Sequence, residues 1–221
     1  MSRVVWKRGL VVSVESRRGH FVLAQLTREP FMIFFRIFRR KDVWADVDLA
    51  NVPVLFCKAV TRQFLQKSRI TRHDIAPHPT AVAPNRWIES RGDFGHVTVW
   101  PGTTYARKVP VLGHGGALVA KDVMGHQGGP YKHPSGTCDR IIKARLTDRR
   151  VIDAHELTSM AVFPATNERL YQCEQAGENV DPEKDLIFRR PLPACYRTYV
   201  DIVMASTAAE KKRLLRLFTA A

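Results

Sequence analysis

Histidines in glycine-rich stretches are the residues of this sequence whose side chains could bind a metal or take part in catalysis. His114, His126 and His133 lie within twenty residues among glycines, and His96 precedes them. Histidines on such loops could converge on zinc, whose sites use closely spaced imidazole and thiolate ligands. No tight pair such as H-x-x-x-H is present, and an ordinary glycine-rich surface loop is the other interpretation. We therefore predict no metal and no cofactor, and a hydrolase built on these loops stays an alternative.

The other catalytic motifs are incomplete. His155-Glu156 begins the H-E-x-x-H pattern of zinc proteases, but Ser159 stands where the second histidine ligand would be. The glycine-rich runs at 113–116 and 125–129 match neither a phosphate-binding loop nor a dinucleotide loop, and no G-x-S-x-G motif is present. A cysteine and a histidine from distant parts of the chain could still pair as nucleophile and base. On these motifs we expect the protein not to be an enzyme.

A dense cluster of charged residues follows the apolar run at residues 31–38. Three bases come first, acids follow at positions 42, 46 and 48, and a second apolar run begins behind Pro53. Two buried strands joined by an exposed charged loop are the simplest interpretation. Such a loop can dock on a protein partner, or bind a nucleic-acid strand by phosphate contact and base stacking, or be a plain charged loop tip. The predicted partner-binding residues are Arg39, Arg40, Lys41, Asp42, Trp44 and Asp46.

Net charge is the unusual feature of the composition. The 221 residues include 35 Lys and Arg against 21 Asp and Glu, a formal net charge of +14, and most of the excess lies near the two ends of the chain. A basic field of this size draws polyanions and acidic proteins to the surface. A nucleic-acid-binding module is therefore the alternative function, and charge that serves solubility alone is a further interpretation.

The elements that would position the charged loop follow from the pattern of apolar residues. Residues 10–15 and 21–26 are β-prone and flank a polar turn with Gly19, which predicts a hairpin. Residues 31–38 are mostly apolar on both faces, so this third strand should be central and covered on both sides. Residues 54–60 predict a fourth strand and residues 61–67 a short helix. The prolines at 77, 79 and 84 exclude a helix there and end the first part near residue 90.

The second half of the chain predicts shorter elements. A hairpin should form from 94–100 and 103–109 around Pro101-Gly102, with further strands near 117–123 and at 140–146, 186–189 and 196–204. Residues 165–176 predict a helix closed by Gly177, and Thr207 to Glu210 form a capping box before a terminal amphipathic helix. The fold class is therefore mainly β within α+β. An antiparallel domain should span 1–90, and a second β-rich part with the C-terminal helix should span 91–221, either with its own core or sharing one core with the first.

Cysteine usage and hydropathy indicate the compartment. The four cysteines, at 57, 138, 173 and 195, form no C-x-x-C pair, and Cys57 lies in an apolar run where a buried thiol is common. The N-terminal apolar patch is too short for a signal peptide, and no apolar run approaches the length of a membrane span. We expect a cytoplasmic protein that does not bind a membrane.

The N-terminal part resembles a known family. It combines a short strand after Lys7-Arg8-Gly9, a hairpin with Gly19, an aromatic third strand, a charged loop, and the run VPVLFCKAV at residues 52–60. This order is similar to that of the immunity protein 26 family of bacterial polymorphic toxin systems, over residues 4–90. The chain departs from that family at Leu10, where Asp tends to follow the glycine, and at residues 68–70, where the family tends to have Trp.

The resemblance implies a small, mostly β, cytoplasmic protein that binds and neutralises a cognate toxin protein. It leaves residues 91–221 without an assignment. We therefore expect a non-enzymatic immunity-type protein that acts in bacterial competition, and the loop between its third and fourth strands would contact the toxin. A net charge of +14 suits an acidic toxin surface better than the basic site of a nuclease.

Overall fold

A computed structural model of the chain describes residues 4–81, 87–90, 93–114, 118–121, 142–144 and 147–218. Contacts between residues divide the chain into two compact units. Unit 1 comprises Met1–Ala83, Met160–Val180 and Arg197–Ala221, and unit 2 comprises Pro84–Ser159 and Asp181–Tyr196. Unit 1 thus joins the N-terminal strands to two segments from the last third of the sequence.

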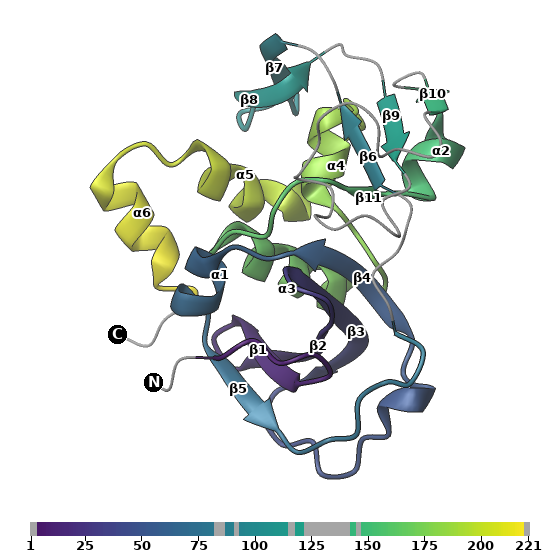
Figure 1. Cartoon of the computed structure of the whole chain (residues 1–221). Coiled ribbons are helices and arrows are strands. Elements are labelled where there is room, and N and C mark those ends of the chain that lie inside the picture. Colours follow the sequence, from purple (N-terminus) through teal and green to yellow (C-terminus); the bar gives the residue numbers. More distant parts are fainter. Residues whose placement is uncertain are drawn as a thin grey trace. The chain divides into compact units, whose positions relative to one another are not determined.

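Unit 1 is built on a five-stranded antiparallel sheet in the order β4-β3-β2-β1-β5 (Figure 1). The first four strands follow the predicted order, which confirms the antiparallel N-terminal sheet and the α+β class. The fifth strand, which we did not predict, adds an edge beside β1. The strands are β1 Val11–Arg17, β2 His20–Leu26, β3 Phe31–Arg39, β4 Val54–Ala59 and β5 Ile70–His73.

The aromatic strand β3 lies inside the sheet, as predicted. It pairs with β2 on one side and β4 on the other, and Phe34 lies opposite both Ala24 and Phe56. Every residue from Phe31 to Phe35 is buried, so both faces of this part of the strand are covered. Burying one such large apolar side chain contributes about 1.5–3 kcal/mol. The strand is therefore a main source of the stability of unit 1.

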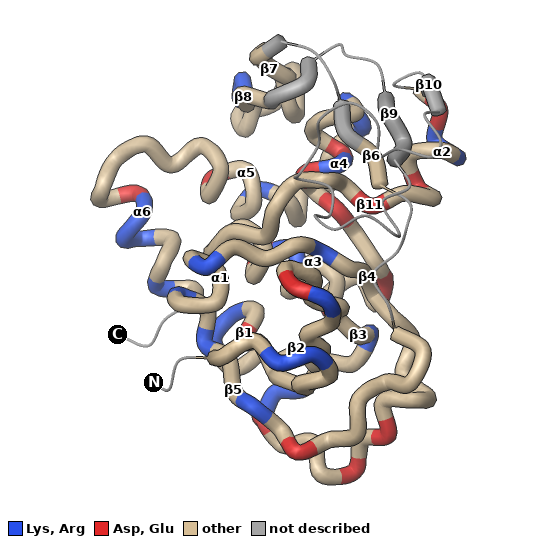
Figure 2. The backbone as a smooth tube through the Cα atoms, in the orientation of Figure 1, with Lys and Arg blue, Asp and Glu red and all other residues tan. Residues whose placement is uncertain are grey.

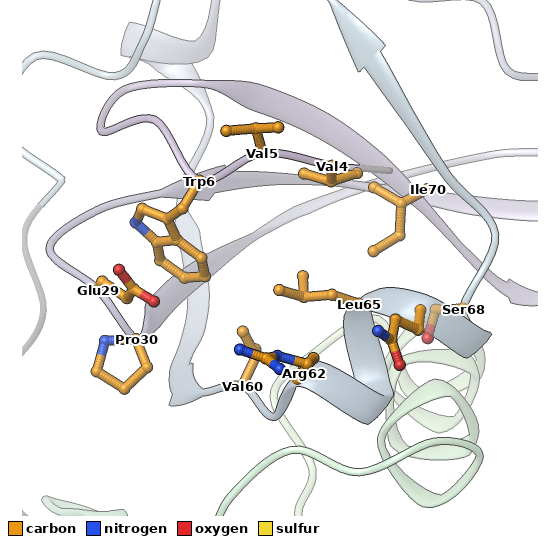
Figure 3. A pocket seen from close by; sticks show the side chains of 11 residues that line it. Val4, Val5, Trp6, Glu29, Pro30, Val60, Arg62, Leu65, Ser68 and Ile70 are labelled. Carbon is orange, nitrogen blue, oxygen red and sulfur yellow. The ribbon is translucent and has the colours of Figure 1, made fainter. Parts of the chain in front are cut away.

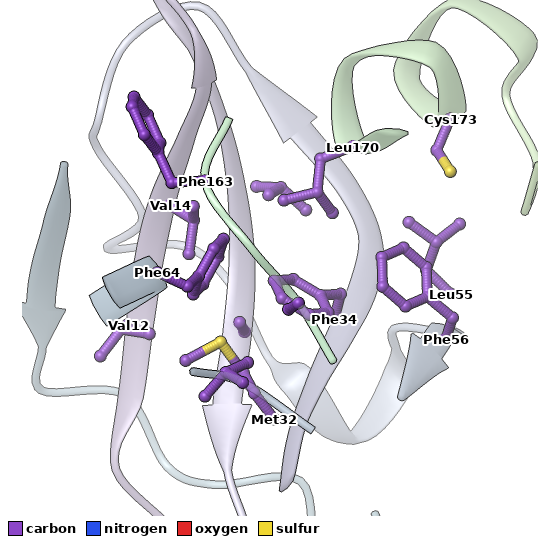
Figure 4. Close-up of a cluster of buried hydrophobic side chains, with 14 of the residues drawn as sticks. Val12, Val14, Met32, Phe34, Leu55, Phe56, Phe64, Phe163, Leu170 and Cys173 are labelled. Atoms are coloured by element: carbon purple, nitrogen blue, oxygen red, sulfur yellow. The ribbon is translucent and has the colours of Figure 1, made fainter. Parts of the chain in front are cut away.

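Helices cover one face of the sheet (Figure 4). The helices α1 (Arg62–Lys67) and α3 (Ala165–Ala176) place Phe64 and Leu170 against this face, and Phe218 follows α6 (Ala208–Leu215) into the same core. The rings of Phe34 and Phe64 meet edge to face, with centroids 6.4 Å apart. Cys173, on α3, is buried in this core, and Cys57 is buried in β4 as predicted.

Loops cover the opposite face of the sheet. The residues between β3 and β4 contribute Trp44 and Leu49, which are only 3% and 1% exposed. His78, from the stretch after β5, stacks on Phe35 with ring centroids 5.8 Å apart. The loop that we expected to protrude therefore forms part of the core, which corrects that expectation for its apolar residues. The correction follows from hydrophobicity, since the second apolar face of β3 needs a cover.

The predicted helices of unit 1 form where their capping signals stand. α3 has the bounds that the sequence predicted and ends at Gly177, whose φ of 70° suits glycine. α6 begins with the predicted capping box, because the Thr207 hydroxyl accepts from the Glu210 N–H while the Glu210 side chain accepts from the Thr207 N–H. α1 is capped by the Thr61 hydroxyl, which accepts from the Phe64 N–H at 3.0 Å.

Two strands predicted near the C-terminus are wrong. Residues 186–189 overlap α4 (Pro182–Ile187), and residues 196–204 contain the helix α5 (Arg197–Met204). α4 carries Asp181 as its N-cap and Pro182 in its first turn, which are helix-start signals. α5 is rich in β-branched and aromatic residues, but Tyr199 and Val200 lie on one buried side, so packing outweighs strand propensity.

Unit 2 has a small core of its own around Ile88, Ile152, Leu157 and Phe188. The predicted hairpin forms, although its second strand lies further along the chain than expected. The strand predicted near 117–123 is confirmed at 118–121, and the strand predicted at 140–146 is confirmed at 142–144. The elements are β6 Trp87–Ser90, β7 Asp93–Val99, β8 Arg107–His114, β9 Leu118–Lys121, β10 Ile142–Ala144, α2 Arg149–Asp153, β11 Glu156–Leu157, α4 and the 3-10 turn Ala194–Tyr196.

The helices in the described ranges are all short. None of them has the length and hydropathy that crossing a membrane would require.

Candidate partner-binding surface

The β3–β4 loop, residues 40–53, carries most of the predicted site residues. It runs from the end of β3 through the 3-10 turn Leu49–Asn51 to the start of β4. Asp48 caps that turn, since its Oδ1 accepts from the Ala50 N–H at 3.0 Å and its Oδ2 accepts from the Asn51 amide at 2.7 Å. The buried side chains of Trp44 and Leu49 fasten the loop to the sheet. The loop is therefore held in one conformation although much of it faces solvent.

Asp42 is the polar anchor of the loop. Its Oδ1 accepts from the indole Nε1 of Trp44 at 2.7 Å and lies 3.1 Å from Nε2 of His73. Burial opposes ionisation of the carboxyl, but hydrogen bonds from Ser13, Trp44 and Thr71, helped by the nearby His73, hold its pKa below the ordinary value. Ser13 belongs to β1, and Thr71 and His73 belong to β5, so the carboxylate attaches the loop to the far edge of the sheet.

Arg39 fastens the loop from the other side. Its guanidinium donates to the Val43 carbonyl at 2.6 Å and to the Asp46 carboxylate at 2.9 Å, and its Cζ lies 5.2 Å from the Trp44 ring centroid. The hydrogen bond from Arg39 lowers the pKa of Asp46 and raises that of Arg39. Because this pair is solvent-exposed, it orders the loop more than it stabilises the fold.

The scaffold leaves only some of the predicted side chains exposed. Arg40, Lys41 and Asp46 are exposed, and Val43 between them is 59% exposed. Trp44, expected as an exposed contact, is buried and faces the sheet instead. The three bases and three acids of residues 39–48 cancel in formal charge. The outer side of the loop is thus a mixed-charge surface with one apolar residue.

A second polar cluster links Arg40 to the helix α3. The Arg40 guanidinium lies against both ring nitrogens of His20, at 3.1 Å from Nδ1 and in close contact with Nε2. His20 Nδ1 donates to the Glu174 carboxylate at 2.8 Å, and the His20 ring meets Tyr171 edge to face. Sequence reasoning missed this cluster, because its members stand up to 154 positions apart.

A buried ion pair lies beside the His20 cluster. Glu168, fully buried, accepts two hydrogen bonds from the Arg17 guanidinium at 2.6 and 2.7 Å and one from Gln172 at 2.7 Å. Arg17 also stacks on Tyr171, with its Cζ 3.9 Å from the ring centroid. This bidentate pair fixes α3 against the β1–β2 turn. Each charge has lost hydration, and only the attraction of the other charge offsets that loss.

Ser13, His73 and Asp42 lie together but do not form a catalytic relay. A relay needs the serine and the carboxylate on opposite ring nitrogens. Here both lie on the same nitrogen, since His73 Nε2 is 2.9 Å from Ser13 Oγ and 3.1 Å from Asp42 Oδ1. Ser13 is also only 1% exposed. The three side chains therefore anchor the loop.

The histidines considered as metal ligands are only partly within the described residues. In the described ranges, no group of three or more His, Cys, Asp or Glu side chains could hold a metal ion. His126 and His133 lie outside those ranges, as do the side chain of His114 and the glycine run at 125–129. His155 is buried, with Nδ1 donating to the Val151 carbonyl at 2.7 Å, so its side chain serves the local fold.

Comparison with known proteins places the chain in a family. No curated protein and no solved structure matches it. A protein-family model described as "Domain of unknown function (DUF8309)" matches residues 1–191, which include the whole five-stranded sheet, the β3–β4 loop and α3. The chain therefore belongs to the family described as domain of unknown function DUF8309.

Proposed function

We propose that the protein is a non-catalytic binding protein of the immunity type, which acts in the cytoplasm and occludes a cognate toxin protein with its β3–β4 loop. The observation that carries the proposal is the construction of this loop. Its inner residues Asp42 and Trp44 are fastened to the sheet, while Arg40, Lys41 and Val43 face solvent. The sequence resemblance to immunity protein 26 over residues 4–90 supports the same reading.

A loop that is already ordered is suited to tight binding. Association must offset the entropy lost when side chains and loops become fixed, about 0.5–1.5 kcal/mol for each immobilised side chain. The anchors at Asp42, Asp48 and the Arg39–Asp46 pair restrict the backbone of the loop before any partner arrives. The partner then meets a preformed surface, which favours affinity through a slow off-rate.

The charge of the loop favours a protein partner over a nucleic acid. A nucleic-acid site needs an excess of bases along the phosphate backbone. Residues 39–48 carry three bases and three acids, and Figure 2 marks these positions along the backbone. Mixed charges around an exposed valine instead match a protein interface, where an apolar centre is surrounded by polar contacts.

The test is binding of the purified chain to any toxin domain that a neighbouring gene encodes, with protection of growth during co-expression as a second measurement. The variant Arg40→Ala/Lys41→Ala/Val43→Ala removes two bases and one exposed valine. Its control, Lys211→Ala/Lys212→Ala/Val203→Ala, likewise removes two bases and one valine, from α6 and α5, where all three are exposed. The loop variant should lose at least tenfold in affinity, about 1.4 kcal/mol, and the control should stay within twofold.

Two results would contradict the proposal. One is a loop variant that binds and protects as well as the control. The other is tight binding to generic DNA or RNA near physiological salt with a steep salt dependence, which would favour the nucleic-acid alternative.

A further inference from the structure

A cavity of about 590 Å³ lies at the N-terminal end of β3, within unit 1 (Figure 3). Its walls come from the segment before β1, the turn between β2 and β3, and the helix α1. Trp6, Val60, Leu65 and Ile70 supply apolar surface. The volume falls within the range of about 300–1,000 Å³ that is typical of small-molecule sites. We call this cavity the Trp6 pocket.

The walls of the Trp6 pocket are ordered by hydrogen bonds of their own. The indole Nε1 of Trp6 donates to the Thr27 carbonyl at 3.1 Å, which fixes the ring against the β2–β3 turn. That turn is closed by the Thr27 N–H and hydroxyl, which both donate to the Phe31 carbonyl at 3.0 Å. On the facing wall, Thr61 caps α1 and also donates from its hydroxyl to the Ala161 carbonyl at 2.9 Å. The pocket is therefore preformed.

Two opposite charges face the Trp6 pocket. Glu29 lies beside Trp6 and Pro30 at one end, and Arg62 lies at the base near Val60 (Figure 3). Both residues are exposed, and in the part of the chain that the structure describes neither side chain has an ion-pair or hydrogen-bond partner. The carboxylate and the guanidinium therefore remain available to a ligand that carries both signs of charge.

We propose that the Trp6 pocket binds a small zwitterion with an apolar body, of the class of the apolar α-amino acids. The ammonium group would meet the Glu29 carboxylate beside the face of Trp6, where a cation is attracted to the aromatic ring. The carboxylate would meet Arg62, whose planar guanidinium suits bidentate contact with a carboxylate. The apolar body lies against Leu65, Val60 and Ile70. A water molecule takes up about 30 Å³ of liquid volume, so a cavity of about 590 Å³ has room for such a ligand.

The Trp6 pocket and the β3–β4 loop lie at opposite ends of β3. The strand comprises nine residues, which corresponds to about 25–30 Å at ~3.3 Å per residue. A ligand in the pocket therefore does not touch Arg40, Lys41 or Val43. The two sites can be tested separately, and the pocket does not depend on the proposed partner.

Isothermal titration of the full chain with three compounds of similar size tests the ligand class. L-phenylalanine carries both charges, phenethylamine only the ammonium and 3-phenylpropionate only the carboxylate. We expect L-phenylalanine to bind at least fivefold more tightly than either single-charge compound. Glu29→Gln should abolish its advantage over 3-phenylpropionate, and Arg62→Gln should abolish its advantage over phenethylamine.

Matched substitutions outside the pocket complete the experiment. Glu178→Gln and Arg72→Gln make the same changes at exposed positions that do not line the pocket, and they should leave all three affinities within twofold. Chemical-shift changes at the Trp6 indole N–H should accompany binding. Equal affinity for the three compounds, absence of binding at 10 mM, or equal effects of the pocket and control substitutions would each overturn the proposal.

Discussion

Trp44→Ala should act by destabilising unit 1 and not by removing a contact with a partner. The side chain is 3% exposed and donates to Asp42 at 2.7 Å, so its removal leaves both a cavity and a carboxylate with one donor fewer. Truncation of a buried Trp to Ala costs about 3–5 kcal/mol. Since whole domains are stable by about 5–15 kcal/mol, this single change should remove a large fraction of the stability of the unit.

Trp44→Phe separates the packing of the ring from its hydrogen bond. The phenyl ring retains much of the buried apolar surface but cannot donate to Asp42. A hydrogen bond to a charged group contributes about 1.5–3 kcal/mol, and Asp42 keeps its other donors from Ser13 and Thr71. We therefore expect a loss of about 1–2 kcal/mol, clearly smaller than for alanine.

Urea unfolding followed by far-UV circular dichroism measures these differences, and hydrogen exchange of the amides in β1 to β5 assigns them to unit 1. Val43→Ala, at the neighbouring 59% exposed position, is the control and should stay within about 0.5 kcal/mol of the unsubstituted chain. A Trp44→Ala variant that unfolds within about 1 kcal/mol of the unsubstituted chain and yet abolishes partner binding would contradict a purely structural role for this side chain. That outcome would mean that Trp44 contacts the partner directly.

Three further predictions concern the scaffold. Glu168→Gln should lower the free energy of unfolding, measured in urea, by about 3–5 kcal/mol, because it leaves the Arg17 charge unpaired beside a buried site. A loss below about 1 kcal/mol would show that the pair behaves as an exposed one. Asp42 has a lowered pKa in the folded state, so its contribution is present above its ordinary pKa of 3.8 and is lost as the pH falls through the folded value. Asp42→Asn should therefore be less stable at neutral pH and lose less stability on acidification, and parallel curves of stability against pH would contradict this. Thr207→Ala removes the cap of α6 and should cost about 1 kcal/mol in thermal unfolding, whereas Ser206→Ala, which removes only a long contact of 3.4 Å from its hydroxyl to the Glu210 carboxylate, should cost clearly less.

The parts of the fold that the sequence predicted are those whose signals are local. β3 is apolar on both faces over Phe31 to Phe35, and that pattern suffices to place it inside the sheet. α3 and α6 carry their own termination or capping residues, Gly177 for the first and Thr207 with Glu210 for the second. Each of these signals lies within a few residues of the element that it determines, so no knowledge of the tertiary structure is needed.

The parts that were missed depend on partners far away in the sequence. β5 is a four-residue strand whose middle positions are exposed, and only its pairing with β1 makes it a strand. Because β5 was not predicted, the role of Asp42 could not be predicted either, since Thr71 and His73 supply two of its contacts. Trp44 beside acidic residues looked like a surface contact, and only the uncovered face of β3 explains why it turns inward.

The charged loop contains two groups of residues that look like one cluster in the sequence: those that hold its conformation and those exposed on its outer side. Asp42 and Trp44 stabilise the loop conformation, and substitutions there act through folding. Lys41 and Val43 contribute little to the fold, since exposed positions of this kind usually change stability by less than about 0.5 kcal/mol, whereas Arg40 also contacts His20. Substitutions on the outer side of the loop should therefore leave the scaffold intact. The proposed function requires this division, because a surface that matches one particular protein must be able to vary without unfolding the domain.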